Sequence, residues 1–378
     1  MTDIRGSCDE RFKGVSDVLA ANLDREADLG ASVAVTREGD LVVDIWGGYA
    51  DDQHRPWDRD TITNVWSTTK TMTALCALIL ADQKELDINR AVSDYWPEFG
   101  AGGKRNVVLL RHLLGHTAGL PGWSEPMTVE DLYDWEKATS LLAAQEPWWE
   151  PGTASGYHAV TQGYLVGEVI RRVTGQTVGT FFREQVAGPL DADFHIGLDP
   201  AEFGRVSNVV PPPAFSDAAL AAFPEMALRT FSNPPLQAEP SWTDGWRRAE
   251  IPAANGHGNA RSVASIQAIM ANGGEAGGRR FLSPAGVETA LQEQSNGTDL
   301  VLNVPVRFGV GYGLPSPDIP ISPSERACFW GGWGGSLILV DMDNRMTFAY
   351  MMNRMAEGLV GDERGFGLAI AVYQALET

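Results

Sequence analysis

Runs of β-forming residues lie near both ends of this chain and are rare in its middle. Two of them, 32–35 and 41–46, flank a turn at 38–40, and two more, 336–341 and 346–352, lie close to the C-terminus. Short turns of this kind connect antiparallel strands, whereas parallel strands need a long crossover connection. The pattern therefore predicts one antiparallel sheet to which both ends of the chain contribute.

Helical patterns flank these runs and fill the region between them. Apolar residues at helical spacing predict one helix within 9–28 and another over 363–376. From residue 88 to 250 the pattern is one of helical segments broken by proline and glycine. The clearest of these segments are 107–115, 129–145 and 158–174. We expect an α/β (α+β) fold in which N- and C-terminal helices flank an antiparallel sheet and a mainly helical lobe is inserted.

The same order of elements divides the chain into two lobes. Residues 1–66 together with 260–378 are expected to form the sheet lobe, and residues 67–259 the mainly helical lobe. Residues 205–250 hold many prolines and show little periodicity, so they are expected to form an irregular excursion. An active site is expected between the two lobes.

The net charge of the chain indicates which kinds of binding partner are expected. The 378 residues carry 49 acidic against 29 basic side chains, a formal net charge of −20. Such a surface repels nucleic acids and anionic membranes and suits a small uncharged substrate, although it also simply keeps a protein soluble. We expect a small-molecule substrate and no nucleic-acid or membrane partner, and both a monomer and a homo-oligomer fit the sequence.

The cysteines and the N-terminus predict a cytoplasmic protein. Cys8, Cys76 and Cys328 follow no spacing typical of a disulfide framework, which fits a reducing compartment. The first residues lack the apolar core of a signal peptide. The longest apolar stretch, 72–81, is too short to cross a bilayer and is expected to form a buried helix.

An S-x-x-K motif runs from Ser67 to Lys70, between a β-rich run at 62–66 and an apolar helical block. Residues i and i+3 of a helix share a face, so the amine of Lys70 is expected to lie beside the Ser67 hydroxyl and take its proton. The helix N-terminus also offers free N–H groups to an oxyanion. A surface lysine at a helix start is the alternative. The absence of a G-x-S-x-G elbow disfavours an α/β-hydrolase.

Several stretches, in this order along the chain, resemble motifs of the serine β-lactamase and penicillin-binding-protein superfamily. The motif of Ser67 and Lys70 resembles the first, and 151–157, which ends in Tyr157, resembles the second. Residues 330–332 stand where the family has its third. The resemblance covers nearly the whole chain. It implies the two-lobed β-lactamase fold and an acyl-enzyme formed on Ser67, with Lys70 and Tyr157 as catalytic partners.

Tyr157 follows a Pro-Gly turn and precedes an apolar helical segment, a position from which its hydroxyl can point into a cleft. We expect the positive charge of Lys70 to lower the pKa of this phenol, which makes Tyr157 a candidate general base or proton shuttle. A half-buried structural tyrosine is the alternative. Either Lys70 or Tyr157 can be the formal base, because two groups so close titrate as a unit.

The second motif departs from the family pattern. Tyr157 is followed by His158 and Ala159, whereas many relatives carry an asparagine at the last position that holds the side chain of a β-lactam. The resemblance therefore implies poor hydrolysis of such antibiotics. His158 is a candidate substrate-binding residue, and a hydrogen bond within the start of the helix is the favoured alternative.

The third motif departs as well. Trp330, Gly331 and Gly332 replace the family's Lys-Thr-Gly and are candidate substrate-binding residues. An indole does not bind a carboxylate and offers an apolar wall with one N–H donor. The alignment implies that the backbone N–H groups of Ser67 and Trp333 form the oxyanion hole. A Gly-rich turn with packed tryptophans is the alternative. These departures most resemble the family VIII carboxylesterases.

Histidines and tryptophans offer further candidates. His112 and His116 lie four residues apart and fit a metal pair, but no third ligand is near in sequence, so a structural turn is favoured. The 12 tryptophans suit a cleft for apolar acyl groups, although packing is the commoner role. Those nearest the second motif and the excursion are Trp123, Trp135, Trp148, Trp149, Trp242 and Trp246.

Together these features predict a serine carboxylesterase, that is, a carboxylic ester hydrolase of the S-x-x-K type. It is expected to hydrolyse small, short-chain or uncharged esters through an acyl-enzyme on Ser67, with no metal or organic cofactor. A β-lactamase, an amidase or D-amino-acid peptidase, and an acyltransferase on the same fold are alternatives. A non-catalytic scaffold that retains the fold is an alternative of a different class.

Overall fold

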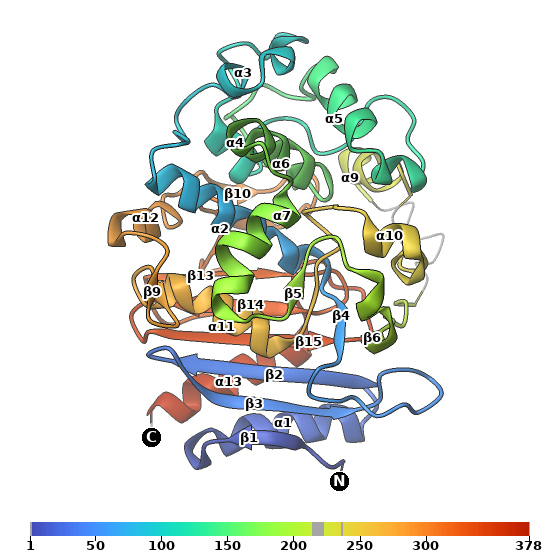
Figure 1. Cartoon of the computed structure of the whole chain (residues 1–378), viewed down its shortest axis with the longest axis vertical. Helices are drawn as coiled ribbons and strands as arrows, with labels where there is room; N and C mark the ends of the chain where they lie inside the picture. Colours follow the sequence, from blue (N-terminus) through green and yellow to red (C-terminus); the bar gives the residue numbers. More distant parts are fainter. Residues whose placement is uncertain (1, 214–222, 236, 378) are drawn as a thin grey trace.

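A nine-stranded antiparallel sheet occupies most of the lower half of the molecule, and one of its edges reaches up among the helices (Figure 1). The structure, a computed structural model, describes residues 2–213, 223–235 and 237–377. The strand order is β1-β3-β2-β15-β14-β13-β12-β11-β10, and every neighbouring pair is antiparallel. The strands are β1 (Arg5–Cys8), β2 (Gly30–Arg37), β3 (Asp40–Gly48), β10 (Ser295–Thr298), β11 (Pro305–Phe308), β12 (Gly313–Leu314), β13 (Ala327–Gly331), β14 (Leu337–Asp341) and β15 (Met346–Met352).

Strands from the N-terminal and C-terminal parts of the chain pair within this sheet, and the sequence predicts that both parts contribute to it. Strand β15 pairs with β2 from Met346 opposite Arg37 to Met352 opposite Ala31. Both strands are buried along almost their whole length. Strands covered on both faces read as near-continuous apolar runs, which is why these two are so readily predicted.

Helices cover both faces of the sheet. Helices α1 (Lys13–Asp24) and α13 (Glu363–Glu377) pack together on one face, and α11 (Ala260–Ala271) packs against β2, β14 and β15 on the other. This arrangement confirms the predicted fold class. Helix α1 is shorter than the predicted 9–28, because Glu10–Phe12 form a 3-10 turn before it and the helix ends at Asp24.

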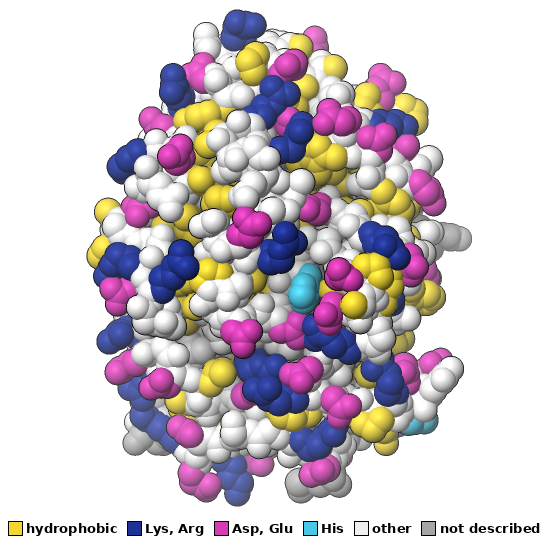
Figure 2. All heavy atoms as spheres, in the orientation of Figure 1, with side chains coloured by type: hydrophobic (Ala, Val, Ile, Leu, Met, Phe, Trp, Pro, Cys, Tyr) yellow, Lys and Arg dark blue, Asp and Glu magenta, His cyan; other side chains and the backbone are white. Residues whose placement is uncertain are grey.

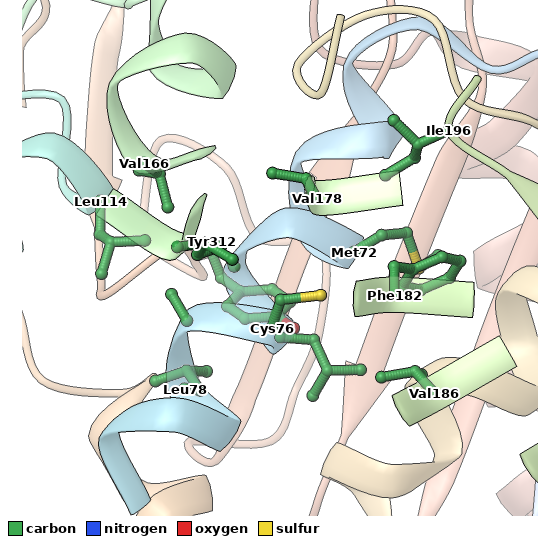
Figure 3. Packing of buried hydrophobic residues seen from close by; sticks show 14 of the residues in the cluster. Met72, Cys76, Leu78, Leu114, Val166, Val178, Phe182, Val186, Ile196 and Tyr312 are labelled. Atoms are coloured by element: carbon green, nitrogen blue, oxygen red, sulfur yellow. The ribbon is translucent and has the colours of Figure 1, made fainter. Parts of the chain in front are cut away.

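Helix α2 (Thr69–Asp82) runs through the core above the sheet, and all its residues from Thr69 to Leu80 are buried. Figure 3 shows Met72, Cys76 and Leu78 of this helix packed among side chains of the surrounding helices. The remaining α-helices of the described residues are α3 (Val92–Tyr95), α4 (Leu110–Leu114), α5 (Trp135–Ala144), α6 (Thr161–Thr174), α7 (Val178–Phe182), α9 (Glu225–Phe231), α10 (Asp244–Arg248) and α12 (Pro284–Thr289). The burial of α2 all round fixes the position of the residues at its N-terminus.

A second, four-stranded sheet supports the N-terminus of α2. Its order is β5-β7-β4-β6, and the strands are β4 (Ile62–Asn64), β5 (Phe194–His195), β6 (Val206–Ser207) and β7 (His257–Gly258). The predicted strand at 62–66 therefore ends two residues early and joins this small sheet. Strand β6, α9 and α10 lie within the predicted excursion 205–250, of which residues 214–222 and 236 lie outside the described residues.

The outer surface carries charges of both signs. Figure 2 shows acidic and basic side chains interspersed over one face of the molecule, with apolar side chains between them. Within the described residues, no helix combines the length and the apolar character that crossing a bilayer requires. Strands β8 (Glu275–Ala276) and β9 (Arg279–Arg280) form a third, two-stranded sheet.

Candidate active site

Ser67 lies in a tight turn where strand β4 gives way to helix α2. Trp66, the residue before it, has a positive φ of 49°, and Ser67 follows in a single 3-10 turn that leads into the helix. A bulky residue in this backbone region is strained, and such strain concentrates at functional sites. Ser336 Oγ donates a hydrogen bond of 2.8 Å to Val65 O and ties the turn to the connection between β13 and β14.

Lys70 places its amine against the Ser67 hydroxyl. Its Nζ lies 3.0 Å from Ser67 Oγ, 2.6 Å from Ala159 O and 2.9 Å from Ala253 O. The side chain is 2% exposed, and no carboxylate lies among these partners. Burial therefore holds the pKa of Lys70 well below its usual value, because the charged form loses its hydration. The local S-x-x-K spacing brings the two groups together as the sequence predicts.

Tyr157 approaches Ser67 from the other side. Its hydroxyl donates a hydrogen bond of 2.6 Å to Ser67 Oγ, and Lys70 Nζ lies 4.9 Å from the centroid of its ring. Contrary to the expectation from sequence, the pKa of Tyr157 is raised. The phenol is 2% exposed, and the loss of hydration outweighs the hydrogen bonds that favour the phenolate. The structure thus favours a protonated Tyr157 that acts as a hydrogen-bond donor.

A buried carboxylate far along the chain holds the backbone of Tyr157. Asp299 Oδ1 accepts hydrogen bonds from the N–H groups of Tyr157, Val301 and Leu302 at 3.0, 2.9 and 2.9 Å. The side chain of Asp299 is fully buried. Sequence reasoning missed this residue, because it lies 142 positions away in a loop and no motif marks it.

The histidines near Tyr157 are engaged with the protein itself. His158 is fully buried, its Nε2 accepts from Leu120 N at 3.1 Å, and its Nδ1 lies 2.6 Å from Gly156 O. This geometry leaves no ring nitrogen for a substrate and favours the alternative, a hydrogen bond at the start of the helix. Burial lowers the pKa of His158 to about 3, so its ring is neutral.

The structure likewise gives His112 and His116 hydrogen-bond partners within the protein. His116 Nδ1 accepts from His158 N at 3.0 Å, and His112 Nδ1 accepts from Leu109 N at 3.2 Å. Among the described residues, no group of three or more His, Cys, Asp or Glu side chains is arranged around a possible metal position. The favoured interpretation, a structural turn, accounts for both residues.

The third motif lies directly against Ser67. Gly332 is in the turn between β13 and β14, and a Cβ built on it overlaps Val65 O and lies 3.2 Å from Ser67 N. The close approach that this glycine allows is therefore to the chain itself. Within the described residues, the N–H groups of Ser67 and Trp333 donate no hydrogen bond. Two free N–H donors beside the candidate nucleophile, Ser67, fit the oxyanion hole expected from the sequence.

Trp330 forms a wall behind Tyr157. Its ring centroid lies 5.4 Å from that of Tyr157, 5.4 Å from that of Phe308 and 6.0 Å from that of His116. The side chain is 2% exposed. It supplies no positive charge where the family has a lysine. Gly331, at the end of β13, packs against the backbone of Val360.

A small cavity of about 20 Å³ lies beside Ala159, and neither Ser67 nor Tyr157 lines it. It is lined by Ala159, whose carbonyl binds Lys70, and by Trp246, whose ring lies 5.6 Å from that of Trp66. No charged side chain of the described residues lines it. Trp123 also borders this cavity, whereas Trp135 and Trp149 donate their indole hydrogens to Glu168 and Ala154 O. Packing thus accounts for several of the candidate tryptophans.

Known proteins resemble this chain over its full extent. The sequence matches the family profile described as Beta-lactamase over residues 15–371. A crystal structure of a family VIII carboxylesterase is 41% identical and covers 99% of this chain and 100% of its own, with a TM-score of 0.92. Esterase/beta-lactamase LipL of Mycobacterium tuberculosis is 35% identical over 96% of this chain and 86% of its own. Esterase EstB of Burkholderia gladioli is 27% identical over 91% and 92%.

These matches agree with the order of motifs, the antiparallel sheet between helices and the Ser67 turn. The resemblance inferred from the sequence is confirmed, and this chain belongs to the Beta-lactamase family.

Proposed function

We propose that this protein is a serine carboxylesterase that forms an acyl-enzyme on Ser67. The observation that carries the proposal is the set of partners around the Lys70 amine. Two of them, Ala159 O and Ala253 O, only accept hydrogen bonds, so they take the two hydrogens of a neutral amine. The lone pair of that amine is then left for the Ser67 hydroxyl, 3.0 Å away. A neutral amine in this position is the base that a serine nucleophile needs.

Acylation begins with the transfer of the Ser67 proton to Lys70. Ser67 Oγ forms a bond to the carbonyl carbon of the ester, and the negative charge moves to the carbonyl oxygen. The N–H groups of Ser67 and Trp333 stabilise that charge. The tetrahedral intermediate collapses when the bond to the alcohol oxygen breaks. That oxygen takes a proton from Tyr157, which regains one from the Lys70 ammonium, so both groups return to their starting states.

Deacylation repeats these steps with water. Lys70 takes a proton from the water, the hydroxide attacks the acyl carbon, and Ser67 leaves with the proton supplied through Tyr157. The carboxylic acid is released and the enzyme is regenerated. All proton transfers are carried out by side chains of this chain.

The substrates that we propose are uncharged esters with short acyl chains. Ser67 is buried, and so are Tyr157 and Trp333 beside it. Such crowded surroundings suit an acetyl or propionyl group better than an octanoyl group. Trp330, which stands in place of a lysine, disfavours substrates with a carboxylate at the third motif. Nitrophenyl esters of increasing chain length provide the test, since we expect kcat/KM to fall from propionate to octanoate.

Intact-mass spectrometry tests the proposed function directly. A fluorophosphonate is expected to add one covalent adduct to the protein, and the Ser67→Ala variant is expected to add none. Turnover of nitrophenyl acetate is then compared with that of a chromogenic cephalosporin, because the relative LipL is named both esterase and β-lactamase. We expect the ester to be preferred. Preference for the cephalosporin would favour a β-lactamase, and the absence of any adduct would favour a non-catalytic scaffold.

A further inference from the structure

An arginine at the start of the last helix fixes the turn that carries the Trp333 N–H. The turn between β13 and β14 contains Gly334 and Gly335, whose φ values of 91° and 127° few other residues adopt. Glycines of this kind leave a turn flexible unless neighbouring groups hold it. The backbone of Gly334 is held on both sides, since its N–H donates to Gly358 O at 2.8 Å and its carbonyl accepts from Ala356 N at 2.9 Å.

Arg364 provides the third of these restraints. Its Nη2 donates a hydrogen bond of 2.6 Å to Gly334 O, one residue beyond Trp333. The guanidinium is 4% exposed. Its other hydrogens go to Asp362, at 2.6 Å, and to Asp28 Oδ1, at 2.8 Å. Arg364 Nη1 also donates to Ala27 O and Arg354 O, so the planar guanidinium is locked in place from several directions.

The turn also rests directly on this ion pair. A Cβ built on Gly335 overlaps the carboxylate of Asp362 and the guanidinium of Arg364. No side chain fits between the turn and the pair. The ion pair therefore acts as a rigid support for the backbone that places the Trp333 N–H.

We propose that Arg364, supported by Asp362, is a positioning residue of the oxyanion hole. The proposal rests on the proposed function, because it takes the Trp333 N–H as an oxyanion donor. Stabilisation by such a donor depends on its orientation before the reaction starts, and a displaced donor weakens the transition state more than the bound ester. Loss of the support is thus expected to lower kcat and to leave KM nearly unchanged.

The test compares Arg364→Lys and Asp362→Asn with Tyr350→Phe. Tyr350 donates a hydrogen bond of 2.6 Å to Asp28 in the same buried network but makes none to the turn, so its loss reports the effect of weakening the network alone. We expect kcat for nitrophenyl acetate to fall about 30-fold in Arg364→Lys and about 10-fold in Asp362→Asn, with KM within threefold of the parent. Tyr350→Phe is expected to lower Tm and to keep kcat within twofold.

Two further measurements keep the result interpretable. Binding of a boronic acid, which places an anionic oxygen in the oxyanion hole, is expected to weaken by the same factor as kcat. Each rate is divided by the fraction of protein that the fluorophosphonate labels. Equal corrected kcat values in Arg364→Lys and Tyr350→Phe would overturn the proposal. A wild-type protein that takes no label on Ser67 would instead overturn the proposed function itself.

Discussion

The two sides of the Ser67 hydroxyl differ in how their polar groups are satisfied. On one side, Lys70 Nζ and the Tyr157 hydroxyl already have partners within 3.0 Å. On the other side, the N–H groups of Ser67 and Trp333 donate to nothing within the described residues. Buried polar groups are nearly always paired, so unpaired donors at a strained turn indicate a place kept for a ligand atom.

This difference separates two tasks. Proton transfer requires groups whose positions and pKa values are set before the substrate arrives, and burial of Lys70 and Tyr157 sets them. Stabilisation of an oxyanion requires donors that stay available for a charge that forms only during the reaction. Removal of the Lys70 amine or the Tyr157 hydroxyl should therefore nearly abolish activity, whereas displacement of the oxyanion donors should lower it by a smaller factor.

The largest effect is expected from Lys70→Ala. Without the base, kcat/KM for nitrophenyl acetate should fall by about 10⁴-fold or more. Lys104→Ala is the matched control, because Lys104 is also fully buried and donates to the carbonyl oxygens of Ala143 and Gln145, far along the chain from Ser67. An equal loss in both variants would show that the effect comes from removing a buried side chain and not from removing the base.

Tyr157→Phe is expected to have the next largest effect. Loss of the donor to Ser67 Oγ and to the leaving alcohol should lower kcat by about 10³-fold. Tyr164→Phe removes another fully buried hydroxyl, which donates to Leu132 O, and should leave kcat within threefold. Full activity in Tyr157→Phe would remove the phenol from the mechanism.

A smaller loss is expected on the oxyanion side. In Gly332→Ala the new Cβ collides with Val65 O and Ser336 Oγ and pushes the turn away from Ser67. We expect kcat to fall by about 10²-fold with little change in KM. Gly309→Ala also places a Cβ against a backbone oxygen, that of Ala290, and should change Tm but not kcat. A loss in Gly332→Ala confined to KM would contradict the assignment of this turn.

The smallest effect is expected from the residue that holds Tyr157. Asp299→Ala removes the acceptor of three backbone N–H groups and should lower kcat about 10-fold. In Asp299→Asn the amide oxygen can accept the same hydrogen bonds, so kcat should recover most of the loss. Identical rates in the two variants would show that the carboxylate does not position the phenol.

The parts of the site that the sequence predicts are those encoded locally. Ser67 and Lys70 are three residues apart, and a helix dictates that they meet. Tyr157 and the Gly-rich turn are far from Ser67 in sequence, and only the family resemblance predicts that they lie beside it. The sequence does not predict the roles of Asp299 and Arg364. Each is a single charged residue without a motif around it, and the part of the site that it holds is far away along the chain.

The fold divides in the same way. The buried strands β2, β14 and β15 and the buried helix α2 read as apolar runs, helix α6 shows helical periodicity, and the sequence predicts all of them. The two-residue strands of the small sheet and the short, polar β10 are too brief for any pattern to develop. The pKa of Tyr157 escaped prediction for a related reason, since burial is a property of the assembled core and outweighs the nearby lysine.

The central claim is that Lys70 is a neutral amine beside Ser67, and the pH dependence of kcat/KM tests it most directly. The base is active when unprotonated, so activity rises with pH through the pKa of Lys70 and then levels off. Because burial lowers this pKa, nitrophenyl acetate turnover, corrected with Ser67→Ala, should reach its plateau well below pH 10.5, the usual pKa of a lysine. A rate that keeps rising to pH 10 would show a lysine that is charged at neutral pH and would contradict the account.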